Sequence, residues 1–154
     1  CSEELDCFRA ALDLGKGILI KASDLKSDSK SKSTSKKSST LLITTGSMIN
    51  ETTSAVISLK AKGISADIYN LRFIKPIDEE YLVSICKGYK KIVIVEDGVK
   101  QGGIGEYIEG VLLKAKLKDI KVLGFPQRFI SQGTRAEVLK DAHLSAQDIK
   151  NAGI

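Results

Sequence analysis

The chain has 154 residues, of which 42% are hydrophobic and 28% charged, a globular composition with a length that suits one packed domain. No run approaches the roughly 20 apolar residues of a membrane helix, and the N-terminus lacks the basic and apolar regions of a secretory signal. Three cysteines without metal-ligand spacing and a single histidine, His143, argue against a zinc site or a Cys/His nucleophile. We expect a soluble, non-secreted domain with no membrane partner and no metal site.

Most of the net charge of +5 falls in one segment. Residues 21–40 hold six lysines against two aspartates and are rich in serine. Such a tract has little to bury, and it lacks the aromatic side chains that accompany lysine and arginine on nucleic-acid-binding surfaces. We therefore expect a disordered insertion at about 24–38 and no nucleic-acid partner.

Hydrophobic periodicity predicts strands that alternate with helices. In chain order the patterns predict a short helix or ordered linker at 2–14, a strand at 17–22, a strand at 40–46, a helix at 48–62, a strand at 65–71, a helix from 79 to about 88, a strand at 91–95, a helix from about 104 to 115, a strand at 121–125, a helix through 140 and a closing helix from 145. The apolar strand at 91–95 does not alternate, which is typical of a central strand covered on both faces. This order predicts an α/β fold of three layers, α/β/α, around a mostly parallel sheet.

Residue types at the helix ends support these boundaries. Gly63 is suited to a left-handed C-terminal cap, and Asp78 is placed to cap the helix that follows it. Thr134 with Glu137 matches a capping box, and Ser145 precedes the closing helix.

A glycine-rich turn, in the stretch EDGVKQGGIGEYIEG, lies between a predicted strand and a helix N-terminus, where free amides favour an anion. Gly102, Gly103 and Gly105 nevertheless match neither common phosphate-binding fingerprint, and the acidic pair Glu96 and Asp97 would repel a phosphate. The turn is a candidate anion site, but close packing of helix on strand is the favoured interpretation.

Two other loops hold candidate interface residues. Arg72 follows a strand and could bind a carboxylate or phosphate, although an internal ion pair is the simpler interpretation. Arg128 stands beside Phe129 in a loop that is suited to a domain or subunit contact. No paired carboxylates and no Ser, His and Asp set can be assembled, so we expect no catalytic residue.

Five segments of the sequence resemble one family closely: LDLGKGILIKA, LLITTGSM, DIYNLRFIKPIDEEYL, KIVIVEDGVKQGGIGEYIEGVLL and VLGFPQRFISQGTRAEVLKDAHLSAQDI. They are similar to the C-terminal domain of 1-deoxy-D-xylulose-5-phosphate synthases, which are transketolase-family enzymes. The resemblance runs from about residue 12 to 150, interrupted by the Ser/Lys tract. The GFPQRFISQGT and RFIKPID stretches are specific to these synthases, whereas the acidic pair with GGIG is shared across the superfamily.

The resemblance implies a five-stranded sheet whose first strand is antiparallel to the others. It also implies an enzyme that condenses pyruvate with glyceraldehyde 3-phosphate, with thiamine diphosphate and magnesium held by upstream domains. The third domain would support a homodimer in a bacterial cytosol or a plastid-like organelle. No catalytic, cofactor-binding or metal-binding residue is carried over, because the motifs that bind these ligands are absent.

The first methionine is Met48, so we expect a piece of a longer protein, with residues 1–15 as a linker and 16–154 as the domain. Two alternatives remain open at this stage. One is a docking domain like that of a 2-oxo acid dehydrogenase β subunit, and the other is a small anion-binding module.

Overall fold

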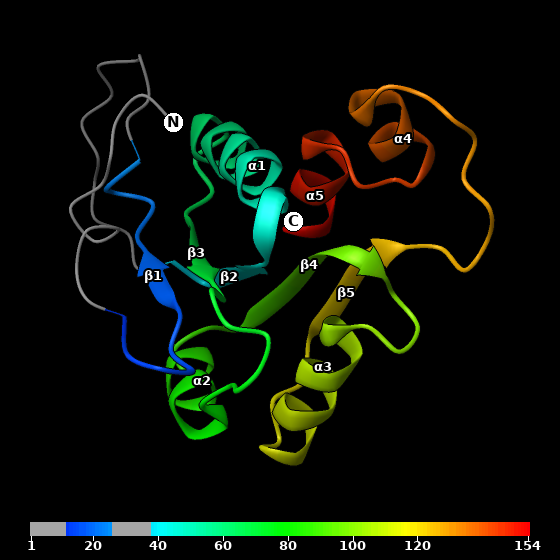
Figure 1. Ribbon diagram of the computed structural model, residues 1–154. Helices are drawn as coiled ribbons and strands as arrows, with labels where there is room; N and C mark the ends of the chain where they lie inside the picture. The colour runs from blue at the N-terminus through cyan, green and yellow to red at the C-terminus, as the bar shows by residue number, and fades with distance from the viewer. Residues whose placement is uncertain (1–11, 26–37) are drawn as a thin grey trace.

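Five strands form the middle layer of the protein in a computed structural model that describes residues 12–25 and 38–154 (Figure 1). They are β1 (Ile18–Ile20), β2 (Thr40–Thr44), β3 (Ala66–Asn70), β4 (Lys91–Val99) and β5 (Ile120–Phe125). Their spatial order is β1-β3-β2-β4-β5, with β1 antiparallel to β3 and the other neighbours parallel. The predicted α/β fold with an antiparallel first strand is confirmed. The strand predicted at 91–95 lies in β4, an interior strand with a parallel neighbour on each side, as expected.

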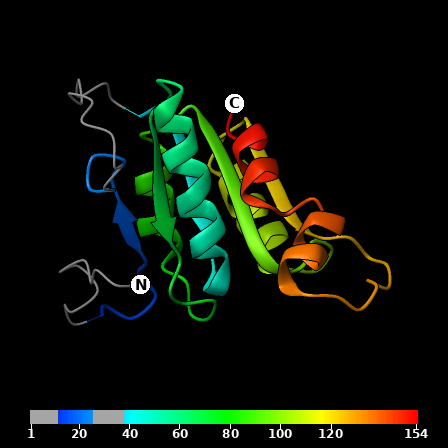
Figure 2. The same cartoon turned by 90° about the horizontal axis from the view of Figure 1, so that it is seen from above.

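Helices cover both faces of this sheet, as the views in Figures 1 and 2 show. They are a 3₁₀ turn at Gly46–Met48 followed by α1 (Ile49–Ala61), α2 (Glu79–Cys86), α3 (Ile104–Lys114), α4 (Arg135–Asp141) and α5 (Ala146–Ala152). Helices α1 and α5 pack on one face with α4 beside them, and α2 and α3 cover the other face. None of the helices in the described ranges is long and apolar enough to cross a membrane.

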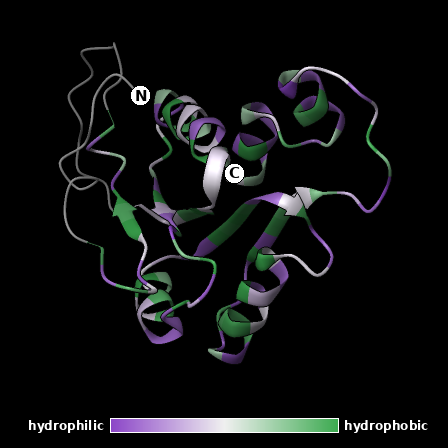
Figure 3. Ribbon diagram, viewed as in Figure 1, coloured by the Kyte–Doolittle hydropathy of each residue, from purple (hydrophilic) through white to green (hydrophobic). Residues whose placement is uncertain are grey.

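Each face of the sheet buries its own apolar cluster, because side chains alternate between the two faces of a strand. In β2, Leu42 packs with α1 and α5, while Leu41 and Ile43 pack with α2 and α3. Figure 3 shows the apolar character as green along much of β4 and β5. The predicted burial of Cys86 is confirmed, since its side chain is fully enclosed and burial raises the pKa of its thiol to about 12.

The local signals at the helix ends are confirmed. Gly63 has φ +76°, the left-handed conformation expected after α1. The Asp78 side chain accepts a hydrogen bond of 2.9 Å from the Tyr81 amide at the start of α2. Thr134 and Ser145 each begin a complete capping box, for α4 and α5.

Three boundaries differ from the sequence analysis or fall outside the described residues. The helix or linker predicted at 2–14 lies mostly outside them, and residues 12–14 are not helical. The insertion predicted at 24–38 lies outside them between 26 and 37, but Leu25 is buried and Ser38 donates a hydrogen bond of 2.8 Å to Asp67. The strand predicted at 91–95 continues to Val99, so that the acidic pair belongs to β4 and not to the glycine-rich turn.

Gly17, which precedes β1, offers a test of how β1 joins the sheet. Its amide donates a hydrogen bond of 2.7 Å to the buried Tyr69 hydroxyl, and an added Cβ would overlap the Asn70 carbonyl oxygen and the Tyr69 ring. We expect Gly17→Ala to lower the free energy of unfolding by about 1–3 kcal/mol, the usual cost of overpacking. The matched control is Gly110→Ala, where a Cβ meets nothing within 4 Å, and it should stabilise helix α3 by about 0.5–1 kcal/mol. Urea denaturation that ranked the two variants in the opposite order would contradict this assignment.

Candidate functional site

The carboxyl end of β4 directs two adjacent carboxylates to opposite faces of the sheet. Val95 faces α1 and α5, so the next residue, Glu96, points toward α3, and Asp97 points back to the side of α1 and α4. The register of β4 against β5 shifts between Val95 and Val99, so the ladder is irregular at the acidic pair. The two acids therefore have separate partners and do not form one site.

Glu96 caps helix α3 from outside the helix. The residue is only 2% exposed, and its Oε2 accepts a hydrogen bond of 3.0 Å from the Ile104 amide. The N-cap residue of α3 is Gly103, which has no side chain to cap the helix. Burial raises the pKa of Glu96, and the amides of Gly105 and Ile104 oppose that rise. The helix N-terminus thus already holds an anion, and that anion belongs to the protein.

The glycines around Glu96 provide the space that its side chain occupies. A Cβ on Gly103 would overlap the Glu96 carboxylate, and a Cβ on Gly105 would stand 2.8 Å from Glu96 Oε1 and 2.5 Å from Val122 Cγ1. A Cβ on Gly124 would approach Glu96 Cγ to 3.0 Å. Two of the three candidate glycines therefore allow close packing, and the geometry supports the packing interpretation over phosphate binding.

Gly102, the third candidate glycine, has a different role. Its φ of +72° is the left-handed conformation that glycine adopts without strain, and a Cβ there would meet nothing within 4 Å. Its amide donates a hydrogen bond of 2.6 Å to Glu106 Oε2 on the exposed side of the turn. A second acidic side chain thus occupies the amides of this turn.

Asp97 belongs to a polar cluster that joins β4 to the starts of α1 and α4. Arg135 Nη2 lies 3.1 Å from Asp97 Oδ2 and 2.9 Å from Ser47 Oγ, and Ser47 also donates a hydrogen bond to Asp97. The Arg135 Nε lies 4.0 Å from Glu51 Oε1. Sequence reasoning missed this cluster because its members are up to 88 residues apart and match no motif. One arginine thus binds two carboxylates, and the cluster links β4 to the starts of α1 and α4.

The structure places the three candidate interface residues in two loops. Arg72 follows β3 and has φ +40°, which is uncommon for a side chain other than glycine. Arg128 forms an ion pair of 2.7 Å with Asp141 and so attaches its loop to the end of α4. Phe129, beside it, is fully exposed. Sequence reasoning grouped Arg128 with Phe129, and the structure shows Arg128 paired within the domain and Phe129 without cover from it.

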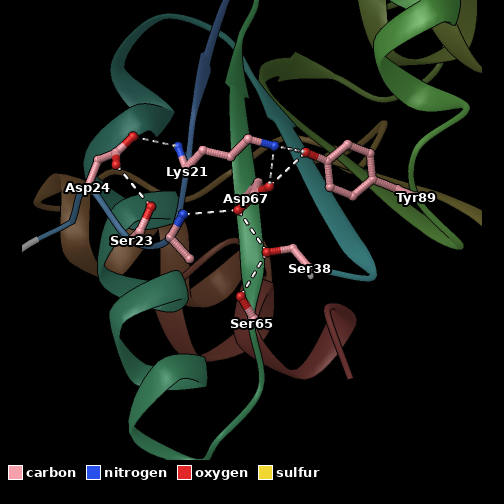
Figure 4. Close-up of polar contacts among 8 residues, drawn as sticks. Lys21, Ser23, Asp24, Ser38, Ser65, Asp67 and Tyr89 are labelled. Atoms are coloured by element: carbon pink, nitrogen blue, oxygen red, sulfur yellow. Dashed lines mark hydrogen bonds and ion pairs between the residues drawn. The ribbon is translucent and has the colours of Figure 1, made fainter. Parts of the chain in front are cut away.

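Asp67 is the centre of a second network that sequence reasoning missed (Figure 4). Its carboxylate is buried and accepts four hydrogen bonds. The donors are the Ala22 amide at 2.9 Å, Lys21 Nζ at 3.0 Å, the Tyr89 hydroxyl at 2.7 Å and Ser38 Oγ at 2.8 Å. The available signal was an acid at an inward-facing position of a strand, two residues before the buried Tyr69.

The Asp67 network holds both borders of the Ser/Lys tract against the sheet. Lys21 and Ala22 precede residues 26–37 of the tract and Ser38 follows them, and Asp67 binds all three. From α1, Lys60 Nζ adds hydrogen bonds of 3.1 Å to the carbonyls of Ala22 and Leu25. Burial alone would raise the pKa of Asp67, but the hydrogen bonds outweigh it and hold that pKa below the ordinary value. The network is structural, because every oxygen of the carboxylate is already engaged.

With this geometry described, comparison with known proteins assigns the family. A family model described as the transketolase C-terminal domain matches residues 29–149. The chain belongs to the transketolase C-terminal domain family. A solved structure of a split gene transketolase, an inactive beta4 tetramer, superposes with a TM-score of 0.77 at 23% identity, over 94% of this chain and 43% of that one. At that identity the superposition supports the fold alone.

The relatives of this transketolase C-terminal domain indicate which enzymes of the family it resembles. The 1-deoxy-D-xylulose-5-phosphate synthase of Treponema pallidum subsp. pallidum is 38% identical over 150 residues, 97% of this chain and 22% of that protein. The synthase of Caldanaerobacter subterraneus subsp. tengcongensis is 37% identical over 105 residues, 68% of this chain and 17% of that protein. The resemblance inferred from the sequence is confirmed, and the chain spans about a fifth of the length of its relative from Treponema pallidum.

The described part of this transketolase C-terminal domain has no set of residues suited to bind thiamine diphosphate or magnesium. Across residues 12–25 and 38–154, no group of three His, Cys, Asp or Glu side chains is placed to hold a metal ion. The N-terminus of α3, the place that sequence reasoning offered to a phosphate, is occupied by Glu96. A diphosphate there would meet a buried carboxylate of the same charge, so the site and the cofactor do not fit.

We expect Glu96→Ala to destabilise the domain by about 2–4 kcal/mol, because it leaves a cavity and frees buried amides of α3. Formate added to the variant should recover part of this loss by entering the vacated space and accepting the Ile104 hydrogen bond. Glu106→Ala, which removes an exposed acid from the same helix, should cost about 0.3–1 kcal/mol and show no formate effect. Equal responses of the two variants to formate in thermal melts would refute the capping role.

We expect Asp67→Asn to lower the free energy of unfolding at neutral pH by about 2–4 kcal/mol, since it leaves Lys21 without its buried counter-charge. Because the pKa of Asp67 is lowered in the folded state, its stabilisation is present above the ordinary value of 3.8 and is lost as the pH falls through the folded value. The difference in free energy of unfolding between the wild type and Asp67→Asn should therefore become smaller in acid. Asp24→Asn, at an exposed neighbour, should change stability by less than about 0.5 kcal/mol. If urea titrations gave the same difference in free energy of unfolding at neutral and acid pH, the stabilising role of the Asp67 charge would be contradicted.

Proposed function

We propose that this chain serves as the third, C-terminal domain of a 1-deoxy-D-xylulose-5-phosphate synthase and supports domain and subunit packing without itself reacting with substrate. The observation that carries the proposal is the 38% identity to the Treponema pallidum synthase, which extends over 97% of this chain but only 22% of that protein. The whole enzyme would condense pyruvate with glyceraldehyde 3-phosphate, losing carbon dioxide, on the route to isoprenoid precursors. Thiamine diphosphate and magnesium would be held by the upstream domains.

Polar chemistry in the described residues supports a packing role. Glu96 is committed to α3, Asp67 to the borders of the Ser/Lys tract, and Asp97 to Arg135. A general acid or base needs a carboxylate that can reach a substrate, and these three carboxylates already have partners within the protein.

Exposed apolar side chains near the two candidate loops support contacts with upstream domains and with a second subunit. Phe129 is fully exposed, and Ile74, in the loop after Arg72, is 59% exposed. An exposed aromatic side chain at a loop tip costs free energy in water and is a common anchor of an interface. We infer that a homodimer forms in part through these loops, in a bacterial cytosol or a plastid-like organelle.

A chimeric enzyme tests the proposal. In it, residues 12–154 of this chain replace the C-terminal domain of the Treponema pallidum synthase. We expect the chimera to form dimers and to condense pyruvate with glyceraldehyde 3-phosphate, whereas the synthase without any C-terminal domain should not. Phe129→Ser in the chimera should weaken the dimer at least about 30-fold in analytical ultracentrifugation, equivalent to about 2 kcal/mol. Ile154→Ser, at an exposed apolar residue of the C-terminus, is the control and should not.

Two other outcomes would favour the alternative functions. An inactive chimera, together with saturable binding of inorganic phosphate to the full chain, would favour an anion-binding module. A stable complex between the full chain and a 2-oxo acid dehydrogenase β subunit, with no activity in the chimera, would favour a docking domain. The occupied N-terminus of α3 argues against the first of these.

A further inference from the structure

Six lysines lie around the amino ends of β4 and β5 and the carboxyl ends of α2 and α3. We call them the lysine rim: Lys87, Lys90, Lys91, Lys114, Lys116 and Lys118. In Figure 3 the start of β4 and the end of α3 are coloured as hydrophilic. Asp119 is the one acid in the two segments, 87–91 and 114–119, that supply the rim.

Backbone pairing brings these segments together. The amides of Lys90 and Lys91 both bind the Ser39 carbonyl, and the Ile92 amide donates a hydrogen bond of 2.9 Å to the Asp119 carbonyl. Because strand β4 pairs with β5 from Ile92 and Ile120 onward, Lys90 and Lys118 lie on the same edge of the sheet. Helices α2 and α3, which bring Lys87 and Lys114, also contact each other.

The rim lysines have no ion pair within the described residues, and five of the six are exposed. Lysines near a helix C-terminus stabilise the helix dipole, which accounts for Lys87 and Lys114. That reason does not extend to Lys90, Lys91 and Lys118, which precede or begin strands. No ion pair in residues 12–25 and 38–154 neutralises their positive charge, which is therefore available to a partner.

Lys116 adopts a left-handed backbone conformation, which is unfavourable for residues other than glycine. Helix α3 ends in a Schellman motif, in which the Lys116 amide bonds the Leu113 carbonyl and the Leu117 amide bonds the Leu112 carbonyl. Lys116 occupies the left-handed position with φ +63°, where helix α1 has Gly63. A lysine where glycine would be unstrained is consistent with a use for its charge.

We propose that the lysine rim, with Leu113 beside it, is a docking surface for an acidic protein segment that also carries an apolar side chain. Leu113 is 54% exposed on α3, three residues before Lys116, so the surface combines an apolar contact with surrounding positive charge. That combination is typical of protein interfaces. A second copy of this face is excluded as the partner, because like charges would repel. The rim also lacks arginine, the side chain that is favoured for phosphate and nucleic-acid recognition.

The test compares two matched triple variants of the full chain. The first carries Lys87→Ala, Lys90→Ala and Lys118→Ala, and the control carries Lys100→Ala, Lys140→Ala and Lys150→Ala. Both lose three positive charges, and both retain every lysine of residues 26–37. The probe is a short fluorescent peptide of glutamates around two leucines, titrated by anisotropy at low ionic strength. The rim triple should weaken binding about tenfold, and the control by less than about threefold.

Two single variants separate the parts of the surface. Leu113→Ser should weaken peptide binding without reducing its salt dependence, because an apolar contact is not screened by salt. Lys116→Gly should raise the Tm by about 2–4 °C, by relieving the left-handed backbone, and yet weaken peptide binding. A variant that is more stable and binds less tightly cannot be explained by partial unfolding.

The binding of other partners, together with the comparison of the two triple variants, shows whether the proposal holds. Equal losses in the two triple variants would overturn the proposal, since only overall charge would then matter. Tighter, rim-dependent binding of duplex DNA or of phosphatidylserine vesicles than of the peptide would also overturn it. The proposal is supported if the peptide binds most tightly and the rim triple alone weakens it.

Discussion

A single buried carboxylate fixes the N-terminus of helix α3 on the sheet. The Glu96 side chain points from β4 toward the face that α3 covers. Its carboxylate accepts a hydrogen bond from the Ile104 amide in the space that Gly103 and Gly105 leave open. A buried charge of this kind is costly unless it is hydrogen-bonded, so carboxylate, glycines and helix end have to occur together. The same constraint explains why a glycine-rich turn at the end of a parallel strand, a common place for a phosphate, has a structural role here.

Two more acids, Asp67 and Asp97, are also paired within the domain. Asp67 lies at the amino end of β3 and ties the chain on both sides of the Ser/Lys tract to the sheet. Asp97 lies at the opposite end of the sheet and connects the starts of α1 and α4 through Arg135. Carboxylates engaged in this way stabilise the arrangement of the elements.

The charged residues are unevenly distributed over the fold, and the net charge of the sequence does not show this. The sequence outside residues 21–40 is nearly neutral in total, so the net charge by itself does not indicate a basic surface there. The fold nevertheless separates the signs. Helix C-termini and strand starts gather the rim lysines at one end of the sheet, while acids such as Glu79 and Glu106 lie in the first turns of α2 and α3. This separation follows from the parallel arrangement, since every crossover helix has its N-terminus near the carboxyl ends of the strands.

The sequence by itself determined the order and type of the elements between residues 17 and 154, the caps of four helices, and the family. Those features are local: hydrophobic period, capping residues and turn glycines act over a few neighbouring positions. The interior position of β4 was also predicted, from its unbroken apolar run, whereas the antiparallel first strand was predicted from family resemblance. The polar networks of Asp67 and Asp97, the role of Glu96 and the lysine rim were decided only by the tertiary structure. Their members come from segments that are distant in sequence, and whether a carboxylate is buried, capped or paired depends on which segments the sheet brings together.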